Sequence, residues 1–180
     1  MNGSTANALT YLVGTLLDLY ITAVLLRLLL QWVRADFYNP VCQFLVKVTN
    51  PAIVPLRRVI PSIRTLDTAS VVLIVALELF SVWIASRISS SPLSFQEIVI
   101  FSFMKLVATL LMTYLILIIA SVILSWVSAR IQHPVVPLVY KLTEPVLAPF
   151  RKIIPPIAGI DLSPLFALIA IRFLLLLIGW

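Results

Sequence analysis

Cysteine, histidine, glycine and charged residues are all scarce in this sequence. The one cysteine, Cys42, excludes an intramolecular disulfide, and the one histidine, His133, leaves no cluster of Cys and His side chains that could hold a metal ion. The four glycines form no phosphate-binding loop. No nucleophile and base stand at an interpretable spacing. We therefore expect no metal, no cofactor and no enzymatic activity.

Charge is especially scarce: Asp, Glu, Lys and Arg make up 11% of the residues, whereas soluble domains contain about 25%. Hydrophobic residues make up 62%, and the mean hydropathy is +1.13. No soluble fold hides that much apolar surface, so the composition predicts an integral membrane protein. The net charge of +6 would suit nucleic acid or anionic lipid. Because the charges flank apolar stretches, we expect contact with membrane lipids and none with nucleic acid.

Four apolar stretches approach or exceed the roughly 20 residues that a membrane-spanning helix needs. They are residues 9–33, 69–88, 98–127 and 164–180. The segment before the first stretch, Met1 to Asn7, contains no Lys or Arg and so lacks the positive region of a cleaved secretory signal. The pattern predicts an all-α membrane protein with four transmembrane helices, the first of which is retained.

The sequence repeats itself, without a gap, at an offset of 94 residues. The corresponding residues are Trp32 and Trp126, Pro40 and Pro134, Lys47 and Lys141, Thr49 and Thr143, Pro51 and Pro145, Pro55 and Pro149, Arg57 and Arg151, Pro61 and Pro155, and Asp67 and Asp161. So many registered residues are not a chance event. We predict two tandem, parallel modules, residues 1–94 and 95–180. Each contains a helix, an amphipathic Pro-rich basic segment and a second helix.

The distribution of Lys and Arg predicts the orientation in the membrane, because short cytoplasmic loops are enriched in these residues. The segment between the first two spans contains Arg34, Lys47, Arg57, Arg58 and Arg64, and the segment between the last two contains Arg130, Lys141, Arg151 and Lys152. The turn between the two modules has only Arg87 at its edge. We therefore expect both Pro-rich segments in the cytoplasm and both termini on the outer side of the membrane.

Each Pro-rich segment begins with residues suited to start a helix. Asn39 can cap a helix at Pro40, and His133 holds the same place in the second module. Apolar residues follow at helical spacing: Val41, Phe44, Leu45 and Val48, and then Val135, Leu138, Val139 and Leu142. We predict that these amphipathic helices end before Pro51 and Pro145, because the residue before a proline avoids the α conformation. A second short element then follows each break.

Six basic residues of these segments are candidates for contact with lipid or with a partner: Lys47, Arg57, Arg58, Lys141, Arg151 and Lys152. One interpretation is a docking surface for another membrane or membrane-associated protein. The other is a segment in the headgroup layer, where each Lys or Arg contributes about 1 kcal/mol at an anionic leaflet. We favour the second interpretation for the segment itself, and a homo-oligomer also stays open.

Two aspartates and two tryptophans recur at the ends of the predicted spans. Asp67 and Asp161 each precede a span, where a carboxylate can accept bonds from the free N–H groups of the first turn, so we expect helix caps. Trp32 and Trp126 end the first and third spans, and we expect them to anchor these helices at the membrane interface.

Apart from Arg87 at the edge of the second span, five charged residues fall inside the predicted spans, where an unpaired charge is costly: Asp18, Arg27, Glu78, Lys105 and Arg172. Glu78 and Arg172 are 94 residues apart, so parallel modules place them at equal depth and we predict an ion pair between them. A pair between Asp18 and Lys105 is a weaker prediction. Such pairs can fix helix packing, which we favour, or can line a path for ions or protons.

The repeated segments resemble the YggT family of membrane proteins, also called YlmG. The residues that carry the resemblance are Trp32, residues 36–40, 47–51 and 55–61, Asp67, Trp126, Pro145, Pro149, Arg151, Pro155 and residues 161–164. The resemblance covers nearly the whole chain and implies an inner-membrane accessory protein of the two-module form. It also implies a link with cell division, with assembly of membrane complexes or with tolerance of osmotic stress, and it identifies no reaction.

The leading hypothesis is a non-enzymatic scaffold or assembly factor that acts through its paired cytoplasmic segments. The alternative is a small ion channel or transporter subunit that uses the intramembrane charges. The scaffold hypothesis predicts that damaging substitutions concentrate in the Pro-rich segments. The transport hypothesis predicts that they concentrate at Asp18, Glu78, Lys105 and Arg172.

Overall fold

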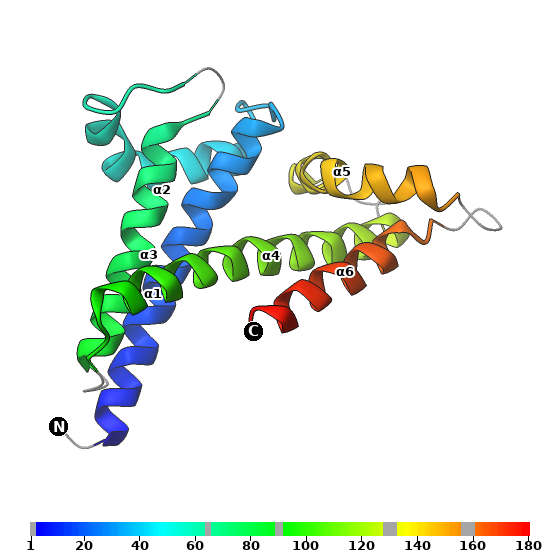
Figure 1. The fold of residues 1–180 in the computed structure, drawn as a ribbon. Helices are drawn as coiled ribbons and strands as arrows, with labels where there is room; N and C mark the ends of the chain where they lie inside the picture. The colour runs from blue at the N-terminus through cyan, green and yellow to red at the C-terminus, as the bar shows by residue number, and fades with distance from the viewer. Residues whose placement is uncertain (1–2, 64–65, 89–91, 128–132, 156–160) are drawn as a thin grey trace. The chain divides into compact units, whose positions relative to one another are not determined.

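The structure is a computed structural model, and it describes residues 3–63, 66–88, 92–127, 133–155 and 161–180. Within these ranges the chain forms six α-helices and no extended strand (Figure 1). The helices are α1 (Gly3–Trp32), α2 (Pro40–Arg57), α3 (Thr68–Ile88), α4 (Phe95–Val127), α5 (Val135–Ile153) and α6 (Ser163–Leu177). The all-α class is therefore confirmed. Arg64 and Arg130, which contribute to the predicted orientation, lie outside the described residues.

Three of these helices are long and apolar enough to cross a membrane, judged over the described residues: Asn7–Trp32, Thr68–Ile88 and Phe95–Trp126. They match the first three predicted spans to within a few residues. The fourth predicted span forms the apolar helix α6, which has 15 residues. At 1.5 Å per residue it is about 22 Å long, whereas the hydrocarbon layer is about 30 Å thick. Helices with the length and composition of membrane spans are thus present at three of the four predicted positions.

The predicted break of the amphipathic helices at Pro51 and Pro145 is wrong. Helix α2 continues through Pro51 and Pro55, and α5 continues through Pro145 and Pro149. Each pair is spaced by four residues, so both prolines lie on one face of their helix, and all four are exposed. The carbonyl groups that lose an N–H partner are therefore on the outer face, where they can bond to water. The opposite face keeps its packing, and the helix continues.

The buried face of the two Pro-rich helices is the same in both copies. In α2 it consists of Leu45, Thr49 and Ile53, which follow at intervals of four residues and are almost fully buried. In α5 it consists of Val139, Thr143 and Leu147, each 94 residues later. These stripes extend past the first proline of each helix. Burial of one continuous apolar face is what stabilises an amphipathic helix, and it outweighs the local preference of the residue before proline.

The chain divides into two compact units. Unit 1 contains Met1–Trp32 and Phe44–Val107, and its core forms where α1 packs against α3 (Figure 1). Unit 2 contains Val33–Gln43 and Ala108–Trp180, and in it α5 packs against α6. These units are defined by contacts in space, so the module boundary between residues 94 and 95 stays a prediction.

Candidate functional site

In unit 1, an ion pair joins the end of α2 to the start of α3. The guanidinium of Arg57 donates from Nε to Oδ1 of Asp67 over 3.2 Å, and from Nη2 to Oδ2 over 2.6 Å. The hydroxyl of Ser70, in the first turn of α3, also donates to Oδ2 over 2.6 Å. The Asp67 side chain is 1% exposed and that of Arg57 is 39% exposed. A carboxylate so deeply buried is stable only because these donors surround it.

In unit 2, the same bond forms between the corresponding residues at the end of α5 and the start of α6. Nε of Arg151 donates to Oδ2 of Asp161 over 2.9 Å, and Nη1 donates to Glu144 over 2.6 Å. The Asp161 and Arg151 side chains are 40% and 41% exposed. Arg151 therefore serves two carboxylates in a solvated setting.

Burial and hydrogen bonding act against each other at both aspartates. Burial alone would raise the pKa of the Asp67 carboxyl, but the bonds from Arg57 and Ser70 outweigh it and hold the pKa below its ordinary value near 3.8. Burial alone would also raise the pKa of the Asp161 carboxyl, but the bonds from Ser163 and Arg151 outweigh it, so this pKa is lowered as well. The bond with Asp161 raises the pKa of the Arg151 guanidinium. At both aspartates, therefore, the hydrogen bonds favour the ionised form of the carboxyl group.

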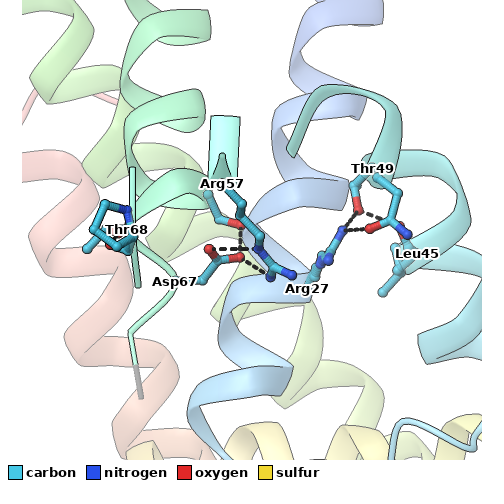
Figure 2. Close-up of polar contacts among 9 residues, drawn as sticks. Arg27, Leu45, Thr49, Arg57, Asp67 and Thr68 are labelled. Atoms are coloured by element: carbon cyan, nitrogen blue, oxygen red, sulfur yellow. Dashed lines mark hydrogen bonds and ion pairs between the residues drawn. The ribbon is translucent and has the colours of Figure 1, made fainter. Parts of the chain in front are cut away.

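A third polar contact in unit 1 ties α1 to the middle of α2. Nη1 of Arg27 donates to Oγ1 of Thr49 over 2.6 Å and to Oδ1 of Asn50 over 2.9 Å. Arg27 is 4% exposed, and the Thr49 hydroxyl itself donates a hydrogen bond to the carbonyl of Leu45. Figure 2 shows Arg27 facing Thr49 and, beside it, Arg57 facing Asp67. Arg27 was predicted only as an intramembrane charge, and the structure makes it the partner of the Pro-rich helix.

The four predicted caps all lie at helix starts, with differences in register. Oδ1 of Asn39 accepts the N–H of Val41 over 2.9 Å, and Nδ1 of His133 accepts the N–H of the corresponding Val135 over 3.3 Å. Asp67 directly precedes α3. In α5 and α6, however, the N-cap positions are Pro134 and Leu162, so His133 and Asp161 lie one residue further out. Asp161 still accepts the N–H of Ser163 over 2.9 Å.

The other three intramembrane charges of unit 1, Asp18, Glu78 and Lys105, form a second polar cluster around Lys105 of α4. Its Nζ lies 2.6 Å from Oδ1 of Asp18, 2.7 Å from Oγ of Ser81 and 3.3 Å from Oε2 of Glu78. The pair predicted between Asp18 and Lys105 is therefore confirmed. Glu78 is 1% exposed, and the ammonium of Lys105 faces its carboxylate. Two acids and one Lys meet at this point.

The predicted partner of Glu78, Arg172, belongs to unit 2. Its Nη1 donates to the carbonyl of Trp180 over 3.4 Å. The ion pair of Glu78 with Arg172 would join the two units, and it stays a prediction. What the structure adds is a cation for Glu78 inside its own unit, Lys105, which the 94-residue offset does not reveal.

The remaining predicted residues have different surroundings. Lys47, Arg58 and Lys152 are exposed on the Pro-rich helices or just after them. Within unit 2, Lys141 instead donates to the carbonyl of Arg34 over 2.6 Å, and Arg34 has a φ of 52° where the chain leaves α1. Trp32 and Trp126 are 56% and 83% exposed, as an interface anchor requires.

Sequence reasoning treated the basic residues and the aspartates separately and missed that Arg57 bonds Asp67 and Arg151 bonds Asp161. A signal was present, because each Asp follows its Arg by ten residues in both copies. The spacing alone could not show the contact, since it depends on a turn that brings the end of one helix back to the start of the next.

Comparison with known proteins gives the following relatives. A sequence model of the CCB3/YggT family matches residues 6–88 and 100–180. The Escherichia coli K12 protein named uncharacterized protein YggT is 38% identical over 162 residues, which cover 88% of this chain and 82% of that protein. Uncharacterized protein PA0392 of Pseudomonas aeruginosa is 39% identical over 173 residues, which cover 95% and 88%. A Vibrio alginolyticus protein, from the region 3′ of proC, is 44% identical over 178 residues, which cover 96% and 94%. No solved structure matches the chain significantly.

Proposed function

The chain belongs to the CCB3/YggT family, and from this premise we propose that it is a non-enzymatic scaffold or assembly factor of the bacterial inner membrane. In this proposal α2 and α5 bind another membrane or membrane-associated protein, while the long apolar helices hold the chain in the bilayer. No cofactor takes part.

The proposed topology has four membrane crossings in two tandem, parallel modules. Helices α2 and α5 lie on the cytoplasmic side and both termini lie in the periplasm. The excess of Lys and Arg around α2 and α5 supports this side, and the recurrence of one ion pair 94 residues apart supports two equivalent modules. Because α6 is short, its crossing requires local thinning of the bilayer or a contribution from the residues beside it.

Thiol labelling tests this topology. In a Cys42→Ser background, a cysteine placed at Ser62 should resist a membrane-impermeant thiol reagent in intact spheroplasts, and one placed at Pro92 should react. Both positions are exposed in the structure and lie outside the helices. The reverse pattern would invert the orientation.

One observation carries the scaffold proposal: each Pro-rich helix is fixed at its C-terminal end by an ion pair, and α2 keeps an exposed face that is both apolar and basic. Phe44 is 63% exposed and Val54 is 42% exposed, and Lys47 and Arg58 are exposed beside them. A rigid helix with such a face suits protein recognition, since ordering it costs no further entropy on binding.

Site-specific photocrosslinking tests the proposal. A photoreactive phenylalanine analogue at Phe44 should give a discrete protein adduct in native membranes, and Lys47→Gln with Arg58→Gln should remove it. The same analogue at Phe103, which is 67% exposed on the apolar helix α4, is the matched control and should give lipid adducts. Lipid adducts at both positions would instead support a segment that lies in the headgroup layer.

A second candidate function is a small ion channel or transporter subunit, which the Lys105 cluster favours. A cavity of about 340 Å³ in unit 1 is lined by Lys105, Ser81 and Thr10, so the cluster has space beside it. Under this proposal, ion flux into proteoliposomes should depend on Glu78 and Lys105. Flux that is absent from the wild-type protein would exclude it.

A further inference from the structure

Unit 2 contains a cavity of about 430 Å³ at the place where α4, α5 and the start of α6 meet. Its polar lining comes from Ser121 and Ser125 of α4, Tyr140 and Arg151 of α5, and Asp161. Cavities of 300 to 1,000 Å³, in round figures, are typical of sites for small molecules. The cavity therefore has the size of a binding site, and its lining includes the ion pair of this unit.

The first copy of the repeat has larger side chains at the corresponding positions of α1. Ser121 corresponds to Arg27, and Ser125 corresponds to Gln31. Positions separated by four residues lie on one face of a helix, so both replacements remove volume from the same face of α4. In unit 1 the Arg27 guanidinium bonds to Thr49 at the middle of the Pro-rich helix. In unit 2 the corresponding face carries two short hydroxyl side chains and borders the cavity.

The serine oxygens on this wall act as hydrogen-bond acceptors. The hydroxyl of Ser121 donates to the carbonyl of Ile118 over 2.7 Å, and that of Ser125 donates to the carbonyl of Val122 over 2.7 Å. A hydroxyl has one hydrogen and two acceptor lone pairs, so these serines have used their donor within the helix. Together with the Asp161 carboxylate, these serine oxygens form a part of the lining that favours a ligand rich in donors. Arg151, which also lines the cavity, donates to Asp161 and Glu144.

The summed charge around the ion pair also differs between the two units, and it is more negative in unit 2. Around the ion pair of unit 1 stand Arg27, Arg57 and Asp67, with the neutral Asn50, which sum to one positive charge. Around that of unit 2 stand Glu144, Arg151 and Asp161, which sum to one negative charge. The basic residue that follows, Arg58 or Lys152, is present in both copies and leaves the difference unchanged. Among the described residues around the two ion pairs, unit 2 thus has one cation fewer and one carboxylate more than unit 1.

We propose that this cavity binds an organic cation with an ammonium or guanidinium group, beside Ser121, the position at which the first copy carries Arg27. The cation donates to Asp161 and to the serine oxygens, and its charge balances the second carboxylate on Arg151. Its source is either a lipid headgroup with a primary ammonium, such as ethanolamine, or a free small amine. The site does not depend on the proposed scaffold function.

Ligand-observed NMR on the full chain in a non-ionic detergent tests the proposal, with n-butylammonium as the probe. The wild-type protein should bind it saturably, and butyrate, which has similar size and the opposite charge, should not bind. Ser121→Arg places the first copy's residue in the cavity and should weaken binding by about tenfold or more, because the guanidinium occupies the site and repels the probe. Circular dichroism and gel filtration verify that the variant is folded.

A second variant keeps the test independent of Ser121. Glu144 is 58% exposed and lies outside the lining of the cavity, so Glu144→Gln should fold normally, and it should weaken binding by about two- to threefold through the loss of a charge that solvent screens. Glu97→Gln, an exposed carboxylate of unit 1, is the matched control and should bind like the wild type. Phosphatidylethanolamine that displaces the probe identifies a lipid headgroup as the source, and no displacement identifies a free amine. The proposal is overturned if the wild-type protein does not bind the probe saturably or binds butyrate equally well. It is also overturned if Ser121→Arg binds the probe as strongly as the wild type does.

Discussion

The ion pairs of Arg57 with Asp67 and of Arg151 with Asp161 use the same residues at the same spacing, yet their surroundings differ. Asp67 is 1% exposed and accepts both bonds of one guanidinium, whereas Asp161 is 40% exposed and shares its Arg with Glu144. Charge pairs exposed to solvent contribute little, and a buried pair is costly to break. The same pattern of residues can therefore be a strong structural link in one unit and a weaker, more accessible one in the other.

The neighbours of each pair explain the difference. In unit 1, Ser70 donates to Asp67 and Arg27 covers the Pro-rich helix. In unit 2 the corresponding residues are Pro164, which has no hydroxyl, and Ser121, which is too short to reach across. The comparison shows that near its ion pair unit 1 uses Ser70 and Arg27 to hold helices together, while at the corresponding place unit 2 leaves Ser121 facing a cavity.

The largest expected effect contrasts the two intramembrane cations. Lys105→Met removes the ammonium group that faces the buried Glu78 and should cost about 3 to 5 kcal/mol, whereas Arg172→Met removes one long bond to a carbonyl and should cost under about 1 kcal/mol. Thermal unfolding in detergent measures both. A double-mutant cycle of Lys105→Met with Glu78→Gln should show coupling. Coupling between Glu78 and Arg172 instead would support the pair that the repeat offset predicts.

The next contrast is between the two aspartates of the ion pairs. Asp67→Asn should destabilise the protein by about 2 to 4 kcal/mol, since it removes a buried charge that three donor groups surround. This expected cost is already lowered to allow for the partial exposure of Arg57 to solvent. Asp161→Asn should cost about 1 kcal/mol or less because its pair is solvated. Unfolding midpoints in detergent measure both losses. Equal losses would mean that the two ion pairs contribute equally to stability despite their different burial.

Arg27→Ser gives unit 1 the residue that unit 2 carries. It should cost about 2 to 3 kcal/mol, because it opens a void and removes the bonds to Thr49 and Asn50. Ser121→Arg should cost less, since it enters an existing cavity. Unfolding midpoints of both variants check the order. Should Ser121→Arg prove the more harmful change, the cavity is not the counterpart of the space that Arg27 fills.

The smallest effect is the dependence on pH. The folded pKa of Asp67 lies below its unfolded value of about 3.9. Its contribution to stability is therefore present above that value and is lost as the pH falls through the folded pKa. The stability difference between the wild type and Asp67→Asn should be constant near neutral pH and shrink only in acid. If this stability difference already shrinks while the pH is still above about 5, the lowered pKa of Asp67 is contradicted.

Much of the fold is predictable from local pattern. Helices α1, α3 and α4 coincide with the first three apolar stretches, except that α1 begins at Gly3, before its stretch, because the length and composition of a spanning helix are dictated by the bilayer. The capping bonds of Asn39 and His133 join residues that are two apart in the sequence, so they depend only on the local sequence. The continuation of α2 through Pro51 was not predictable from the proline alone, since it depends on which face of the helix is buried.

Composition, spacing along the chain and residue identity were enough to establish the class of the protein, its repeat and its family. The three-dimensional arrangement was needed to show that Arg57 bonds Asp67, that Lys105 reaches both Asp18 and Glu78, and that Ser121 borders a cavity. Such contacts join residues on different helices, whose facing sides are set by packing. The burial that makes one ion pair strong and leaves another exposed is a property of the space around it, which spacing along the chain does not contain.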